Sequence, residues 1–202
     1  MMCAGSLRSI VLLCVASSVL MACAGGGRPV EQLDARAGMT IVRGREPLVF
    51  ARTEPRYSRS ARDYVYLGPV ETNRQGVREY YLWVGIATTL DRGFLGVAAP
   101  APELLFVDIG GEPIELTLKP WHDVVATSFT NPVYATDVPV REELVARVTL
   151  QQLALLEGEP LESIIVANAS QDVRRRYVRW MHDAGLADFL ERVAGTAERP
   201  VQ

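Results

Sequence analysis

Short runs of apolar residues, broken by glycine, proline and asparagine, recur along most of this 202-residue chain. Runs of this length that end at turn-forming residues are typical of β-strands. The runs that predict strands are residues 40–42, 48–52, 64–70, 79–88, 104–109, 112–118, 133–138 and 161–167. Some of these runs are very short, and we expect about six or seven strands in all.

Two of these runs, 104–109 and 112–118, flank a Gly-Gly pair and predict a tight hairpin. Pairing Ile109 with Glu112 places aliphatic residues opposite one another on a single face. The expected cross-strand pairs are Leu105 with Leu116 and Val107 with Ile114. This hairpin should therefore turn one apolar face toward a core.

A second hairpin is predicted around residues 72–76, where an asparagine and a glycine suit a four-residue loop. The glycine at the end of this loop would take the positive φ. Pairing Thr72 with Val77 gathers four aromatic residues on one face of the hairpin. In this register Tyr66 lies opposite Trp83, on the same face as Tyr64 and Tyr81.

Two later stretches have apolar residues near helical spacing. Residues 141–155 begin with a glutamate pair that suits a first helical turn. Ser170 is a suitable N-cap for a helix that reaches about Asp183, with an apolar stripe made of Val173, Tyr177, Trp180 and Met181. A terminal turn is expected at 186–193. Strands followed by helices predict an α+β fold, with a mainly antiparallel sheet or small β-sandwich and helices toward the C-terminus.

The first 22 residues have the three parts of an export signal. Arg8 supplies positive charge, residues 10–20 form an apolar segment, and small residues lead to Cys23. Eleven residues make roughly 16 Å of helix, which is shorter than the roughly 30 Å hydrocarbon core of a bilayer. The segment therefore predicts a signal and not a membrane span.

The sequence Leu20-Met21-Ala22-Cys23 resembles the cleavage site of a bacterial lipoprotein precursor. The resemblance implies cleavage before Cys23, a diacylglyceryl group on its sulfur and usually an acyl chain on the new amine. Two or three chains hold a protein on a membrane, whereas one anchors it only marginally. Ala24 implies the outer membrane, facing the periplasm, if the source has two membranes. The alternative is an ordinary secretory signal that leaves Cys23 unmodified.

The chain is thus expected to have four parts. These are a lipoprotein signal peptide (1–22), the lipidated cysteine with a flexible tether (23–39), a single globular α+β domain (40–195) and a disordered tail (196–202). Cys3 and Cys14 lie within the signal, so we expect no intramolecular disulfide in the mature chain. The domain must depend on its apolar core for stability.

The net charge and the lack of catalytic motifs limit the functions that the sequence predicts. A formal net charge of −3 provides no global basic field for nucleic acid. A catalytic metal site normally needs three protein ligands, and beyond the signal the chain has only two histidines, His122 and His182. No serine lies in a nucleophile elbow. We therefore predict no catalytic residue, metal or cofactor; for a hydrolase of cell-wall or lipid substrates, the best available pair is His122 and Asp123.

Two clusters are candidates for binding a partner. Arg174, Arg175 and Arg176 form the densest basic cluster, which is either a solvated face or a contact for an anionic partner such as lipid head groups or an acidic protein. The aromatic face centred on Tyr66 and Trp83 is either sheet packing or a binding platform.

Together these features predict a membrane-anchored envelope lipoprotein whose domain is a non-catalytic binding or assembly module. Its partners would be the membrane, through Cys23, and an envelope protein. A periplasmic hydrolase is one alternative. A small-ligand carrier is another, and it would need a sizeable apolar cavity inside the fold.

Overall fold

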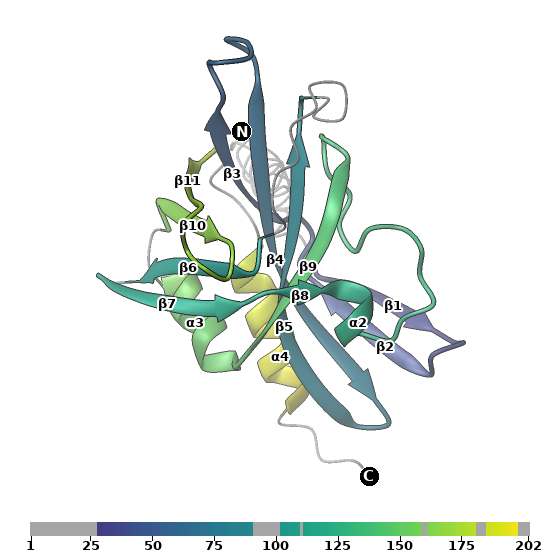
Figure 1. Ribbon diagram of the computed structural model, residues 1–202. Helices are drawn as coiled ribbons and strands as arrows, with labels where there is room; N and C mark the ends of the chain where they lie inside the picture. Colours follow the sequence, from purple (N-terminus) through teal and green to yellow (C-terminus); the bar gives the residue numbers. More distant parts are fainter. Residues whose placement is uncertain (1–27, 91–101, 110, 159–160, 181–184, 198–202) are drawn as a thin grey trace, which may run out of the picture.

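The computed structural model describes residues 28–90, 102–109, 111–158, 161–180 and 185–197. In this part, eleven strands form a nearly closed antiparallel barrel (Figure 1). The strands are β1 (Val30–Asp34), β2 (Met39–Arg43), β3 (Leu48–Thr53), β4 (Arg62–Arg74), β5 (Val77–Thr88), β6 (Leu104–Ile109), β7 (Glu112–Thr117), β8 (Lys119–Pro120), β9 (Val140–Val148), β10 (Ser163–Ala167) and β11 (Arg174–Arg179). The helices are α2 (Trp121–Val124), α3 (Leu150–Gly158) and α4 (Leu186–Ala197).

The barrel closes through one continuous piece of chain. The strand order is β7-β6-β10-β11-β3-β4-β5-β9-β8, and a single residue, Leu118, separates its two ends in the sequence. β7 pairs with β6, and β8 pairs with β9. Between them, the Leu118 amide donates a 2.7 Å hydrogen bond to the carbonyl of Glu103. Residues 112–120 therefore join the two edges of the sheet.

The predicted sheet or sandwich of six or seven strands with C-terminal helices is wrong, because eleven strands form a barrel. One cause is the helix predicted at 141–155, of which residues 141–148 belong to β9 and only residues 150–155 are helical, in α3. Leu144 points into the barrel and Val145 points to a second apolar cluster outside it. A strand buried on both faces loses the alternation of apolar and polar residues. Its apolar spacing therefore resembled that of a helix.

The helix predicted from Ser170 is also wrong, because residues 174–179 form β11. Tyr177 points inward and is buried, whereas Val178 and Trp180 are exposed on the opposite face. Apolar residues on the solvent side obscure the period of two and leave an accidental helical stripe. Where only a terminal turn was expected at 186–193, the structure has helix α4.

The hairpin predictions had different outcomes. The pairing of β6 with β7 is confirmed residue by residue, including Ile109 with Glu112. In the β4–β5 hairpin, Gly76 has the expected positive φ of 88°, but Gln75 also has a positive φ and the loop contains only two residues. Arg74 therefore pairs with Val77, two positions away from the predicted register. A shift of two keeps the aromatic residues on one face.

Two further predictions need correction at the ends and loops of the barrel. Residues 133–138 form no strand. Residues 30–34, assigned to the tether, form β1, which pairs with β2. The predicted tether therefore cannot include residues 30–34.

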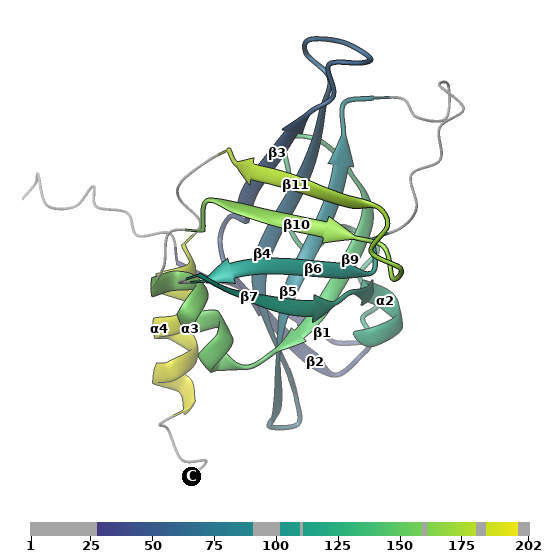
Figure 2. The same cartoon turned by 60° about the vertical axis from the view of Figure 1, so that its left-hand side comes forward.

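Apolar side chains fill the interior of the barrel. Phe50, Val65, Val84 and Leu105 all have 0% exposure. Figure 2 shows β6, β7, β10 and β11 crossing in front of β3, β4, β5 and β9, with α3 and α4 at one end. Leu153 of α3 and Phe189 of α4 join the same apolar cluster as the strands. The helices therefore extend the core beyond the barrel wall.

A second apolar cluster lies on the outer face of β4, β5 and β9. It includes Tyr66, Trp83, Trp121, Tyr134 and Val145, and residues 121–140 contribute much of its cover. Tyr134 is fully buried, and its hydroxyl donates to the Pro69 carbonyl at 2.6 Å and accepts from the Gly44 amide at 3.0 Å. Burial raises the pKa of Tyr134. Tyr134 therefore attaches the second half of this covering segment, residues 121–140, to the barrel.

We predict that Gly68→Ala will displace the Tyr134 side chain from its buried position. A Cβ at position 68 would lie 2.4 Å from ring carbons of Tyr134, so the ring must move. The free energy of unfolding should fall by about 1–3 kcal/mol, as is typical of overpacking, when measured by denaturant unfolding. Gly195→Ala in α4, where a Cβ meets nothing within 4 Å, is the control. Equal stability of Gly68→Ala and the wild type would contradict this role of Tyr134.

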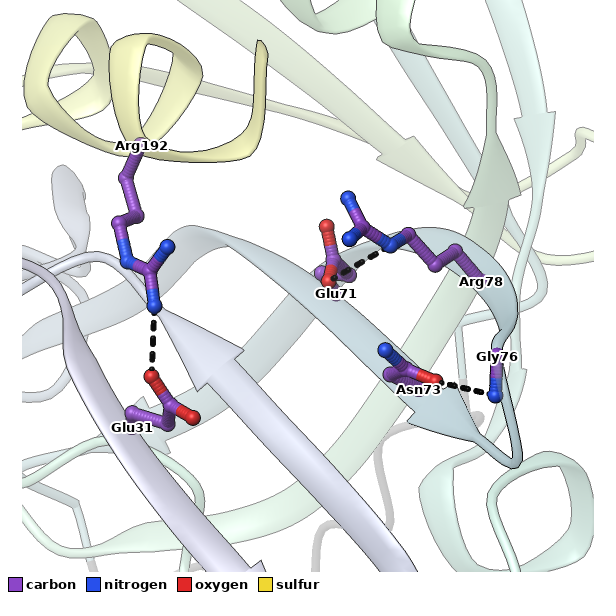
Figure 3. A network of polar contacts seen from close by, with 6 residues as sticks. All are labelled: Glu31, Glu71, Asn73, Gly76, Arg78 and Arg192. Carbon is purple, nitrogen blue, oxygen red and sulfur yellow. Dashed lines mark hydrogen bonds and ion pairs between the residues drawn. The ribbon is translucent and has the colours of Figure 1, made fainter. Parts of the chain in front are cut away.

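A polar network joins β1, the β4–β5 hairpin and α4 (Figure 3). Glu31 Oε2 lies 2.8 Å from Arg192 Nη2, and Glu71 Oε1 lies 4.0 Å from Arg78 Nε. Glu71 is buried, and its Oε2 has no hydrogen-bond partner among the described residues. Burial raises the pKa of Glu71, although Arg78 and Arg192 oppose the rise.

We therefore predict that Glu71→Gln will raise the melting temperature at neutral pH. Because the folded pKa lies above the unfolded pKa, ionisation of Glu71 opposes folding as the pH rises through this range. Below the unfolded pKa both states are protonated, so the advantage of glutamine should disappear in acid. Thermal unfolding at several pH values tests this, with Glu115→Gln on the exposed face of β7 as control. A lower melting temperature at neutral pH would show that the pair with Arg78 outweighs the burial cost.

Candidate binding cleft under the 127–133 loop

The loop after α2 is fastened to the barrel by Asp34, the last residue of β1. Asp34 is 1% exposed and accepts hydrogen bonds from the hydroxyl of Thr127 at 2.9 Å and the hydroxyl of Ser128 at 2.6 Å. It also accepts from the backbone amides of Ser128 and Ala37. These bonds, led by those from Ser128, hold the pKa of the Asp34 carboxyl well below its usual range. An ionised aspartate therefore sets the position of the loop.

A cleft of about 330 Å³ opens beside this fastening. This volume is near the lower limit of typical small-molecule sites, which is about 300 Å³. Its apolar wall includes Ile41, Trp121 and Phe129, and its polar residues are Gln32, Thr127, Ser128, Thr130 and Asn131. None of the residues lining the cleft is charged. The lining therefore suits an uncharged ligand that has both hydrogen-bonding groups and an apolar surface.

Three of the polar side chains in the cleft have unused hydrogen-bonding capacity. Thr127 and Ser128 are committed to Asp34. Within the described residues, the side chains of Gln32, Thr130 and Asn131 make no hydrogen bond to the protein. Two amides and one hydroxyl offer both donors and acceptors. They supply the directional contacts that a ligand would need.

The structure places the predicted aromatic patch beneath residues 121–140, which cover the outer face of β4, β5 and β9. Tyr66 and Trp83 are 3% and 0% exposed. Trp83 Nε1 donates to Glu143 at 2.8 Å, and the Tyr66 hydroxyl accepts from the Val138 amide at 3.3 Å. Of the two interpretations of this face, the geometry favours packing.

The predicted arginines divide between the two faces of β11. Arg174 and Arg176 are exposed, whereas Arg175 is half-buried and lines a small cavity of about 60 Å³ with Tyr177 and Glu142. Burial raises the pKa of Tyr177. This cavity is much smaller than a typical ligand site. The filled barrel core likewise gives no support to a carrier that holds its ligand inside.

The structure describes one of the two histidines considered for catalysis. His122 and Asp123 are both exposed on α2, and His182 and Cys23 lie outside the described residues. Among the described residues, no group of three histidine, cysteine, aspartate or glutamate side chains is arranged to hold a metal ion. Within the described part of the chain, the side chain of His122 makes no hydrogen bond that would join it to a nucleophile or an orienting group.

Sequence reasoning missed the cleft and its fastening. Asp34 fell in the predicted tether, and no strand or helix was predicted for residues 119–132. The available signal was the run Thr127-Ser128 between apolar residues, because hydroxyl residues often bond to a nearby carboxylate or backbone group. The partner lies more than 90 positions away, so the pairing itself could not be found from spacing.

Comparisons with protein-family models, curated proteins and solved structures find no match to this chain. In the part of the chain that the structure describes, no helix is both long enough and apolar enough to cross a membrane.

We predict that Asp34→Asn will loosen the loop while the barrel stays folded. Asparagine cannot accept the four hydrogen bonds in the same way, and it removes the charge that strengthens them. Amide hydrogen exchange should accelerate at residues 127–129 and remain unchanged in β4 and β5. In the wild type, the lowered pKa means that this fastening contributes above the unfolded pKa and is lost as the pH falls through the folded value. Unchanged exchange at Ser128 in the variant would contradict the role of Asp34.

Proposed function

We propose that the chain is a membrane-anchored envelope lipoprotein whose barrel is a non-catalytic binding module for a small uncharged ligand. The single observation that carries the binding role is the cleft under the 127–133 loop. Its wall is preorganised by Asp34, and its uncharged amide and hydroxyl groups are available. Preorganised polar groups lower the cost of ordering the site when a ligand binds.

The chemistry of the cleft favours a sugar residue. A sugar presents several hydroxyl groups around its ring edge and an apolar patch of C–H groups on a ring face. The lining offers matching elements, with Gln32 and Asn131 as paired donors and acceptors and Phe129 as an apolar contact. A charged ligand would be desolvated without any opposite charge among the lining residues.

The anchor is proposed from the amino-terminal sequence. Leu20-Met21-Ala22-Cys23 supports lipidation of Cys23, and β1, the first strand of the described residues, begins seven positions later at Val30. Seven extended residues span at most about 25 Å. A lipidated chain would therefore hold the barrel close to the membrane surface, where envelope saccharides are available as ligands.

We expect neutral mono- and disaccharides to bind to the purified protein, and the matching uronic acids to bind more weakly. Isothermal titration calorimetry with both sets measures this preference. Asn131→Ala should weaken the binding of a neutral sugar by roughly fivefold, which corresponds to about 1 kcal/mol for one lost hydrogen bond. Gln32→Ala should have a similar effect.

Gln151→Ala, which removes an exposed amide from α3 outside the cleft, is the matched control. If Asn131→Ala and Gln151→Ala bind a sugar equally well, the ligand does not occupy this cleft. If no neutral sugar binds, or if the uronic acids bind more tightly, the proposed ligand class is wrong.

A further inference from the structure

A second surface combines exposed apolar residues with unpaired positive charge. It lies on the outer face of β11 and includes Arg62 from the start of β4, on the far side of β3. We name it the β11 patch: Arg62, Arg174, Arg176, Val178 and Trp180. Val178 and Trp180 are 56% and 48% exposed. Monomeric proteins rarely expose large apolar side chains together without a function.

The arginines of this patch are held by neutral groups. Arg62 lies over the Trp180 ring at 4.8 Å, and Arg174 lies over the Phe106 ring at 4.7 Å. Arg176 Nε donates to the hydroxyl of Ser163 at 3.1 Å. Within the described ranges, none of these three arginines forms a salt bridge. Their charges are therefore not neutralised locally and can attract an anionic partner.

The patch lies near the point where the chain leaves the barrel toward Cys23. The Trp180 amide donates to the carbonyl of Val49, which is paired with Tyr66 of β4. On the same edge of β4, Val30 pairs with Arg43, which is paired with Val70. Val70 lies four positions after Tyr66, which is roughly 13 Å along the strand. A lipid attached at Cys23 would therefore be within reach of the plane of the patch.

We propose that the β11 patch docks on an anionic membrane surface. Tryptophan and arginine are suited to this interface, because the indole ring and the arginine stem bury apolar surface while the guanidinium remains at the head groups. Each basic residue near an anionic leaflet adds to the attraction. The short connection to Cys23 supplies a high local concentration, so a weak surface contact is enough to orient the barrel.

Quenching of Trp180 by lipid tests the docking. The full chain, purified from membranes, is reconstituted into vesicles of brominated phosphatidylcholine with or without phosphatidylglycerol. Of the three tryptophans, Trp83 and Trp121 are 0% and 2% exposed, so only Trp180 should be quenched. We expect quenching in the vesicles that contain phosphatidylglycerol, a decrease with added salt, and no quenching in Trp180→Phe.

Replacing both Arg174 and Arg176 with glutamine should lower the ratio of docked to undocked protein roughly twenty-five-fold, by a factor of about five for each arginine. The control is Arg36→Gln, which removes an exposed arginine from the β1–β2 turn. Thermal unfolding of every variant shows whether it is folded. Absence of Trp180 quenching in the wild type, or equal quenching in the double variant, would overturn the proposal. Crosslinking of the patch to an acidic protein, with Trp180 shielded from lipid, would assign the surface to that protein instead.

Discussion

The fold depends on the double pairing of residues 112–120. This stretch pairs with β6 through β7 and with β9 through β8, and the Leu118 amide bonds to Glu103 at the change of partner. Without residues 112–120, which we call the seam, β6 and β9 would each expose an unpaired strand edge, and such edges promote aggregation. The seam also places α2 directly after β8, so closure of the barrel determines where the outer cover begins.

Because the barrel interior is filled, the cleft proposed to bind a ligand lies on the outside of the barrel. The interior is occupied by side chains such as Phe50 and Val65, whereas the outer face of β4 and β5 is covered by a loop segment. Two distant contacts fix that segment, with Asp34 holding its first half and Tyr134 its second. Loops held on a rigid scaffold commonly carry binding sites, and the cleft lies beside the Asp34 contact.

The sequence allowed local features to be predicted where one face of a strand is apolar and the other polar. The β6–β7 hairpin met this condition, and its register was correct. β9 is buried on both faces and β11 exposes Val178 and Trp180, so neither shows the period of two, and both were mistaken for helices. The cleft depends on the pairing of Asp34 with Ser128 across the chain. Such a contact is set by barrel closure, which local patterns do not encode.

The proposed membrane-held position would link the cleft to envelope saccharides and the β11 patch to lipid, and the chemical state of Cys23 tests this position most directly. The measurement is mass spectrometry of the amino-terminal peptide from protein extracted from its native membranes. The prediction is a peptide that begins at Cys23 and carries a diacylglyceryl group on the sulfur. An unmodified Cys23, or a mature chain that begins elsewhere, would contradict the proposed anchoring.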